Sequence, residues 1–216
     1  MSDDELIDVM TEEGGPVLGG DGRQRQKTRA EIHRDGDWHA AFHLWVVSGS
    51  GVLLQRRGSH KHSWPSRLDA TAAGHLTAGE QPLDGLREAE EELGVAYSAS
   101  ALFGLGIHDV EEEAEDGTIN REHQHLFGVF DDRPLTAFTS LQDEEVDGLV
   151  EIAHDAFAQL ATVPRPWAAS TTADARAWDG SVVTEITVSG DELVPAPYLP
   201  ALPALLARVV AAGSQT

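Results

Sequence analysis

The sequence predicts an α/β protein with a mixed β-sheet packed by helices. Segments typical of strands and segments typical of helices interleave irregularly along the chain. The length of 216 residues fits one enlarged domain, which is long enough to bury a sizeable core. The chain has no cysteine, so no disulfide framework stands in for that core.

The net charge excludes two classes of partner. There are 15 lysines and arginines against 37 aspartates and glutamates, which gives a net charge of −22. Nucleic acids and anionic membranes bind clustered cations, so we expect neither as a partner. The start, MSDDELIDVM, has no basic region and no long apolar stretch, so we expect a cytoplasmic protein without a membrane anchor.

Composition divides the chain into three segments. Residues 1–28 form a polar lead-in, residues 29–165 the main domain, and residues 166–216 an extension packed on the same domain. The extension contains an apolar helix at residues 199–212. This helix could form a homodimer contact or close the core.

The main domain begins with a hairpin and contains one clear helix. Two β-rich runs, at residues 38–47 and 52–55, flank Ser-Gly-Ser-Gly, a typical hairpin turn. The clearest helix covers residues 82–93 and is followed by Gly94, a typical helix stop. The remaining predicted elements are strands at residues 101–110, 125–130, 145–152 and 182–188 and a helix at 154–160.

The predicted helix at residues 82–93 carries an unusual group of acids. Its apolar residues fall on one stripe that should face the core: Leu83, Leu86, Ala89 and Leu93. Three glutamates lie on the opposite face: Glu88, Glu91 and Glu92. Like charges at this spacing lose roughly 0.2–0.5 kcal/mol per pair, so the alternatives are a solvated acidic face and a cation site. Oxygen ligands without imidazole or thiolate suit Mg²⁺, or Mn²⁺.

This segment resembles the signature of the Nudix hydrolases: glycine, five residues, glutamate, seven residues, then Arg-Glu-U-x-Glu-Glu-x-Gly-U with U apolar. The matching residues are Gly74, Glu80, Arg87, Glu88, Ala89, Glu91, Glu92, Gly94 and Val95. Only six residues separate Glu80 from Arg87, which shortens the loop before the helix. The resemblance implies a Nudix-type α/β/α sandwich.

The resemblance also implies an enzyme and a reaction. A Nudix-type pyrophosphohydrolase, which acts on acid anhydrides, would use Mg²⁺ to cleave a diphosphate linkage in a small nucleoside diphosphate derivative or related diphosphate. Glu88, Glu91 and Glu92 would hold the metal, and Glu91 or Glu92 would orient or deprotonate water. Arg87 would position Glu88, and Glu122 would join the site from a later strand.

A wider resemblance, over residues 29–160, links the chain to the Nudix branch that contains the type I isopentenyl diphosphate isomerases. Arg57 and Lys61 match isomerase positions that contact the diphosphate; ordinary surface ion pairs are the alternative. His39, His75 and Glu122 match members of the isomerase metal site; a hydrogen-bonded scaffold is the alternative.

Two other functions remain as alternatives to hydrolysis. An isomerase would need a cysteine immediately before Gly74-His75, but Ala73 stands there. A catalytically silent, nucleotide-binding Nudix module is the second alternative. Four tryptophans could stack a nucleobase or pack in the core, and their spacing selects none of them: Trp45, Trp64, Trp167 and Trp178.

Overall fold

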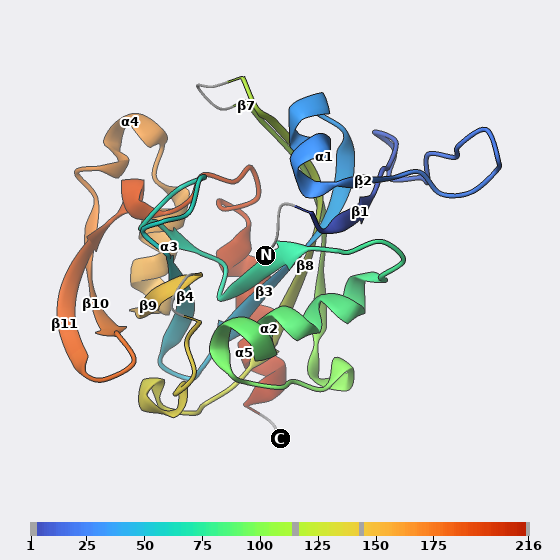
Figure 1. Ribbon diagram of the computed structural model, residues 1–216. Helices are drawn as coiled ribbons and strands as arrows, with labels where there is room; N and C mark the ends of the chain where they lie inside the picture. Colours follow the sequence, from blue (N-terminus) through green and yellow to red (C-terminus); the bar gives the residue numbers. More distant parts are fainter. Residues whose placement is uncertain (1–3, 114–116, 143–144, 215–216) are drawn as a thin grey trace. The chain divides into compact units, whose positions relative to one another are not determined.

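The computed structural model describes residues 4–113, 117–142 and 145–214 (Figure 1). Two compact units make up the described chain. Unit 1 comprises the residues up to 43, residues 73–85 and residues 106–126, and unit 2 comprises residues 44–72, 86–105 and those from 127 onwards. Strands β3, β6, β7 and β8 contribute residues to both units, which are described separately below.

Unit 1 contains the N-terminal strands, the first helix and parts of five further elements. Strands β1 and β2 pair in antiparallel fashion, and β3, β8 and β7 are neighbours in that order, with β6 beside β3. The elements are β1 (Leu6–Asp8), β2 (Gln26–Thr28), α1 (Arg29–Asp35), β3 (Trp38–Val47), β6 (Ala72–His75), the 3-10 helix η1 (Pro82–Leu86), β7 (Phe103–Glu113) and β8 (Ile119–Phe130).

The N-terminal segment takes part in the core of unit 1. Ile7, Val9 and Ile32 form a buried cluster, against which Val17 packs. The described part of segment 1–28 therefore contributes two strands and core residues. Helix α1, which was not predicted, begins with a capping box in which Thr28 and Glu31 bond to each other's backbone N–H, and it ends at Gly36 with φ +67°.

Unit 2 is built around four antiparallel strands. Strands β11, β10, β9 and β4 are antiparallel neighbours in that order, and β5 pairs with β4. A parallel bridge joins Leu68 to Leu193. The elements are β4 (Gly51–Arg57), β5 (Leu68–Asp69), α2 (Arg87–Leu93), β9 (Val146–Ala153), α3 (His154–Thr162), α4 (Arg165–Ala168), β10 (Thr172–Trp178), β11 (Val183–Ser189) and α5 (Leu202–Gly213).

Helices lie on both faces of the sheet in unit 2. Trp45, near the end of β3, packs against Phe157 of α3, with ring centroids 6.1 Å apart, and α3 in turn contacts α5. Gln55 of β4 points to the opposite face, as the register of β3 and β4 requires, and contacts Glu92 of α2. The predicted α/β class, with a mixed sheet between helices, is confirmed.

The predicted hairpin is confirmed, and the predicted helix needs a correction. Ser48 N–H donates to the carbonyl of Gly51 at 2.9 Å between β3 and β4. Residues 82–93 divide into η1 and α2, so the 3.6-residue periodicity does not hold throughout. Leu83 is 45% exposed instead of facing the core. Gly85 is buried in its place and packs closely against Phe42. A Cβ at this position would lie only 2.4 Å from Cβ of Phe42.

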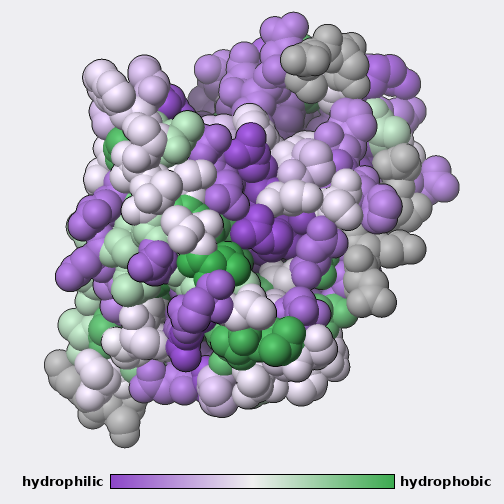
Figure 2. All heavy atoms as spheres, turned by 90° about the vertical axis from the view of Figure 1, so that its left-hand side faces the viewer, coloured by the Kyte–Doolittle hydropathy of each residue, from purple (hydrophilic) through white to green (hydrophobic). Residues whose placement is uncertain are grey.

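The surface is largely hydrophilic on the face shown in Figure 2, with hydrophobic residues in smaller groups. Such a surface suits an acidic chain whose carboxylates are mostly solvated. Within the described ranges, no helix has the length and hydropathy needed to cross a membrane.

Candidate active site

Helix α2 of unit 2 presents the predicted carboxylates. Ala89 and Leu93 are fully buried and anchor the helix. Glu88 and Glu92 are only 2% exposed, whereas the side chain of Glu91 is 52% exposed. The prediction that all three acids face away from the core is therefore wrong for two of them. Burial of a carboxylate is costly unless charged or polar groups compensate it.

Two side chains compensate these carboxylates in part. Arg87 Nη1 donates to Glu88 Oε1 at 2.6 Å and to Glu91 Oε2 at 3.4 Å, so one guanidinium bridges two acids. Gln55 Nε2 donates to Glu92 Oε2 at 3.3 Å from the facing strand β4. Gln55 was not predicted as a site residue. A single amide at the end of the apolar run 52–55 is a signal that could have indicated it.

Gly94 fixes the end of α2, as the sequence predicts. Its φ of +67° lies in the left-handed region, and its N–H donates to the carbonyl of Glu90 at 3.0 Å. A Cβ at this position would lie 2.5 Å from Cβ of Ser140. Only glycine therefore satisfies both the backbone conformation and the close approach.

The two cations predicted to contact a diphosphate lie in unit 2 and are both ion-paired. Arg57 Nη1 donates to Asp69 Oδ2 at 2.8 Å, and Lys61 pairs with Glu145. Arg57 also donates to the carbonyl oxygen of Ser63 from Nε at 3.3 Å and from Nη2 at 3.1 Å. These contacts are compatible with either role considered above, because a phosphate could share or replace a carboxylate partner.

Four residues lie close together in unit 1. The sequence suggested a role for three of them, His39, His75 and Glu122, but not for the fourth, His33. His33, His39 and His75 each offer a ring nitrogen, and these atoms lie within 4.8 Å of one another. Glu122 Oε1 lies 3.3 Å from Nε2 of His75 and 3.9 Å from Nε2 of His39. We call these four residues the histidine cluster. His33 was not assigned a role from the sequence, although a second histidine shortly before His39 was a visible signal.

The electrostatics of the histidine cluster favour neutral rings around an ionised carboxylate. Burial lowers the pKa of His33 and of His39 to about 4 in each case, with a neighbouring imidazole as the next cause. Burial opposes the ionisation of Glu122, but its hydrogen bond with His75 and the nearby His39 hold its pKa well below the usual range. The rings can therefore act as nitrogen ligands near neutral pH.

Two amides hold the carboxylate of Glu122 from its own strand. Asn120 Nδ2 donates to Oε1 at 2.9 Å, and Gln124 Nε2 donates to Oε2 at 2.6 Å. Alternate residues of a strand share a face, so this arrangement follows from the spacing of the three residues on β8. The sequence analysis singled out Glu122 but not these two partners.

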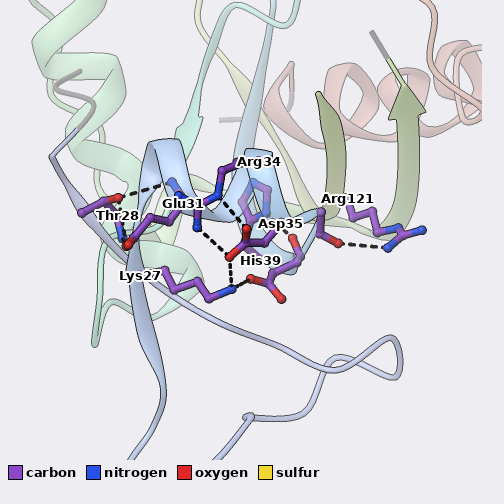
Figure 3. A network of polar contacts seen from close by, with 9 residues as sticks. Lys27, Thr28, Glu31, Arg34, Asp35, His39 and Arg121 are labelled. Carbon is purple, nitrogen blue, oxygen red and sulfur yellow. Dashed lines mark hydrogen bonds and ion pairs between the residues drawn. The ribbon is translucent and has the colours of Figure 1, made fainter. Parts of the chain in front are cut away.

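A polar network around α1 lies next to His39 of the histidine cluster (Figure 3). Lys27 donates to Asp35 at 2.7 Å and also to Asp37, at the two ends of the turn that follows α1. The ring of His39 contacts the carbonyl of Asp37 through Nδ1 at 3.1 Å. If Nδ1 carries the proton, Nε2 holds the lone pair; this buried atom makes no hydrogen bond within the described residues.

Two further residues of the motif, Gly74 and Glu80, lie in unit 1. Gly74 is part of β6, and Glu80 Oε2 accepts a hydrogen bond from Thr77 N–H at 2.7 Å. Glu80 also lines a pocket of about 280 Å³. The pocket is lined by Asp8, Met10, Gly14, Pro16, Gln24, Ala40, Leu76, Thr77, Glu80, Gln81, Pro82 and His125.

Comparison with known proteins shows the family to which the chain belongs. The NUDIX domain family matches residues 37–173, which is more than half of the chain. The chain belongs to the Nudix family, and the predicted class of enzyme, a Nudix-type pyrophosphohydrolase, is confirmed. Members of the family generally use divalent metal ions and act on small molecules.

Among its relatives is a Nudix hydrolase of Clostridium acetobutylicum, described as uncharacterized, which is 36% identical over 73% of this chain and 74% of its own length. Nudix hydrolase 3 of Arabidopsis thaliana is 36% identical over 71% of this chain but only 20% of its own length. The crystal structure of DR0079 from Deinococcus radiodurans covers 67% of this chain and 81% of its own, at 19% identity and a TM-score of 0.50. That likeness concerns the fold alone.

Proposed function

We propose that this protein hydrolyses a diphosphate linkage in a small nucleoside diphosphate derivative or related diphosphate, with Mg²⁺ at the carboxylates of α2. The observation that carries the proposal is the group of three glutamates on one short helix. Two of them are almost fully buried: Glu88, which Arg87 contacts, and Glu92, which Gln55 contacts. Burying two carboxylates beside a third is costly, and a bound cation would offset that cost.

The donor set fits a hard divalent ion. Glu88, Glu91 and Glu92 offer only oxygen, the ligand that Mg²⁺ and Mn²⁺ prefer. A divalent ion bound there would lower the pKa of a water ligand and neutralise charge on the leaving phosphate. Glu91 has the exposed carboxylate of the three, so it is the residue that we assign to taking the proton from the attacking water.

Arg87 and Glu122 have distinct supporting roles in this proposal. Arg87 positions Glu88 through the 2.6 Å hydrogen bond and keeps the Glu91 carboxylate close to it. Glu122 acts within the histidine cluster as an ionised group held by Asn120 and Gln124. Arg57 and Lys61 would bind the diphosphate by exchanging part of their contacts with Asp69 and Glu145.

The histidine cluster fits an ion of a different kind. The buried Nε2 of His39, which makes no hydrogen bond within the described residues, and the ionised Glu122 would form a site with mixed nitrogen and oxygen ligands. Such ligands suit transition ions such as Zn²⁺ or Co²⁺ better than Mg²⁺. We therefore propose that a second divalent ion binds there, in place of the purely hydrogen-bonded scaffold that the sequence left open.

The test of the function is a panel of nucleoside diphosphates and triphosphates, nucleotide sugars, dinucleotides and prenyl diphosphates, assayed with Mg²⁺ and with Mn²⁺. We expect phosphate-bond cleavage of a nucleoside diphosphate derivative, and a loss of about 10²–10⁴-fold in kcat for Glu91→Gln. Glu90→Gln, an exposed acid on the same helix, is the matched control and should keep full activity. Full activity of Glu91→Gln would overturn its assignment.

The same panel addresses the two alternatives. Conversion of isopentenyl diphosphate to its allylic isomer would indicate isomerase chemistry, for which Ala73 offers no acid in place of a cysteine. Tight binding of a nucleotide sugar without turnover in either metal would indicate a silent binding module. Hydrolysis of no compound in the panel would refute the proposed function.

A further inference from the structure

The loop between β4 and β5 of unit 2 has an unusual backbone. Within the described residues, Trp64 and Ser66 are the non-glycine residues with positive φ, at +51° and +60°. A bulky residue in this region is an outlier. Trp64 also precedes Pro65, and a residue before proline is normally restricted to extended conformations. A strained conformation of this kind persists only when the surrounding structure imposes it.

The loop is tied down on both sides of Trp64. Arg57 holds Ser63 through hydrogen bonds to its carbonyl, and Lys61 pairs with Glu145. The N–H of Ser59 donates to Asp147 Oδ2 at 3.0 Å, and the N–H of Arg67 donates to the carbonyl of Trp64 at 3.3 Å. These contacts fix the backbone, yet the side chain of Trp64 remains 37% exposed.

The structure also separates Trp64 from the other tryptophans considered as stacking residues. Trp45 and Trp178 are buried in the core. Trp167 is exposed, but it lies on α4, away in sequence from the proposed phosphate ligands. Trp64 lies in the same loop as Lys61, and this loop follows Arg57 directly. Arg57 and the loop that follows it therefore combine two cations with a partly exposed aromatic ring on a backbone held in place.

We infer that Trp64 is a specificity-determining residue that stacks on a planar base of the substrate, so that the substrate class is a nucleoside diphosphate rather than a prenyl diphosphate. This inference rests on the proposed function for the diphosphate half of the molecule. Aromatic side chains stack on any base, since every base has a π-face, and the loss of one stack typically weakens binding by about 5-fold to 150-fold. A loop backbone that is already held in place loses little conformational entropy on binding.

Two glycine substitutions separate stacking from the backbone effect. Glycine adopts positive φ without strain, so Trp64→Gly and Ser66→Gly both relieve the backbone, but only the first removes a ring. The binding of ADP, UDP and inorganic pyrophosphate would be measured by calorimetry with Mg²⁺. We expect Trp64→Gly to weaken ADP and UDP binding about tenfold and to leave pyrophosphate binding unchanged. Ser66→Gly should change neither, and Trp64→Phe should stay within about threefold of the wild type.

The outcomes distinguish this inference from the proposed function. Unchanged nucleotide binding by Trp64→Gly, or equal weakening of ADP and pyrophosphate, would overturn the stacking role. If the wild type binds pyrophosphate but not ADP or UDP, the inference fails while hydrolysis of another diphosphate can still stand. If the expected binding pattern is seen but no compound of the panel is hydrolysed, the inference holds and the proposed function fails.

Discussion

The two groups of titratable side chains differ in ligand chemistry. The histidine cluster of unit 1 gathers three imidazoles around one carboxylate, whereas α2 of unit 2 carries three carboxylates beside one guanidinium. Nitrogen ligands suit transition ions, and oxygen ligands suit Mg²⁺. Under the proposed function, one Nudix chain would therefore offer two sites that select different ions.

The two groups also differ in how they are held. The histidine cluster collects residues from α1, β3, β6 and β8, and the turn after α1 is fixed by Lys27. The glutamates come from one helix of seven residues, whose position depends on its buried face and on Gly94. A site assembled from many elements is sensitive to supporting contacts, whereas a site on one helix is sensitive to the placement of that helix.

The largest effect should come from moving α2. Gly94→Ala places an alanine at φ +67° and pushes its Cβ into Ser140, so it combines a left-handed backbone penalty with overpacking. We expect it to lower the free energy of unfolding by about 2–5 kcal/mol. Gly79→Ala in unit 1 is the control, because it has φ +86° but no atom within 4 Å of the new Cβ. It should cost only about 1–2 kcal/mol by chemical denaturation.

Equal losses from these two variants would contradict this account of Gly94. If Gly94→Ala folds at low temperature, its Mg²⁺-dependent activity should fall further than that of Gly79→Ala. The difference between the two variants then measures how strongly the carboxylates depend on the placement of their helix.

Ion selectivity gives the next largest effect. Titration with Co²⁺, followed by visible absorption, should show an ion with imidazole ligands in the wild type, and His75→Gln should weaken its binding more than about 100-fold. Glu91→Gln should leave Co²⁺ binding at the histidine cluster unchanged. His60→Gln, which changes an exposed histidine of unit 2, is the matched control. Loss of the signal in Glu91→Gln but not in His75→Gln would reverse the two assignments.

A smaller effect on ion binding is expected when a residue that supports the histidine cluster is removed. Lys27→Ala leaves Asp35 and Asp37 without their shared ammonium partner and loosens the turn whose carbonyl contacts His39. We expect Co²⁺ affinity to fall about tenfold, the lower end of the range for outer contacts of metal ligands. Arg23→Ala, at an arginine whose side chain is 88% exposed, should have no effect. An equal loss in both variants would indicate nonspecific charge effects.

Local patterns in the sequence predicted several elements of unit 2 and the glutamates that its helix α2 carries. Alternating apolar runs and the turn at residues 48–51 predicted the β3–β4 hairpin, and the glutamate spacing predicted the residues on α2. The burial of Glu92 was not predictable, because Glu92 contacts Gln55 of β4, which lies more than thirty residues away in sequence. Tertiary packing decides such features, not periodicity.

Unit 1 was harder to predict for a related reason. Its N-terminal residues are polar and glycine-rich, so composition alone predicted a lead-in, while the pairing of β1 with β2 spans about twenty residues. Helix α1 has seven residues and little amphipathic signal, and only its capping box at Thr28 and Glu31 marked it. The meeting of His33 with His39 and His75 follows from that helix and from strand pairing, which single-sequence patterns do not determine.

The smallest predicted effect is on stability at low pH. It depends on Asp35, which supports the histidine cluster of unit 1, and not on the glutamates of α2. Hydrogen bonds from Arg34 and then from Lys27 lower the pKa of Asp35. Since the folded pKa lies below the unfolded one, the stabilisation is present above a pH of about 4 and is lost as the pH falls further. Asp35→Asn should therefore be less stable than the wild type at pH 6, and this difference should shrink as the pH falls below 4. Measuring the difference between the two proteins cancels the titration of groups that both share, including the histidines. A difference that stays constant down to pH 2 would mean that Asp35 acts through packing and not through its charge.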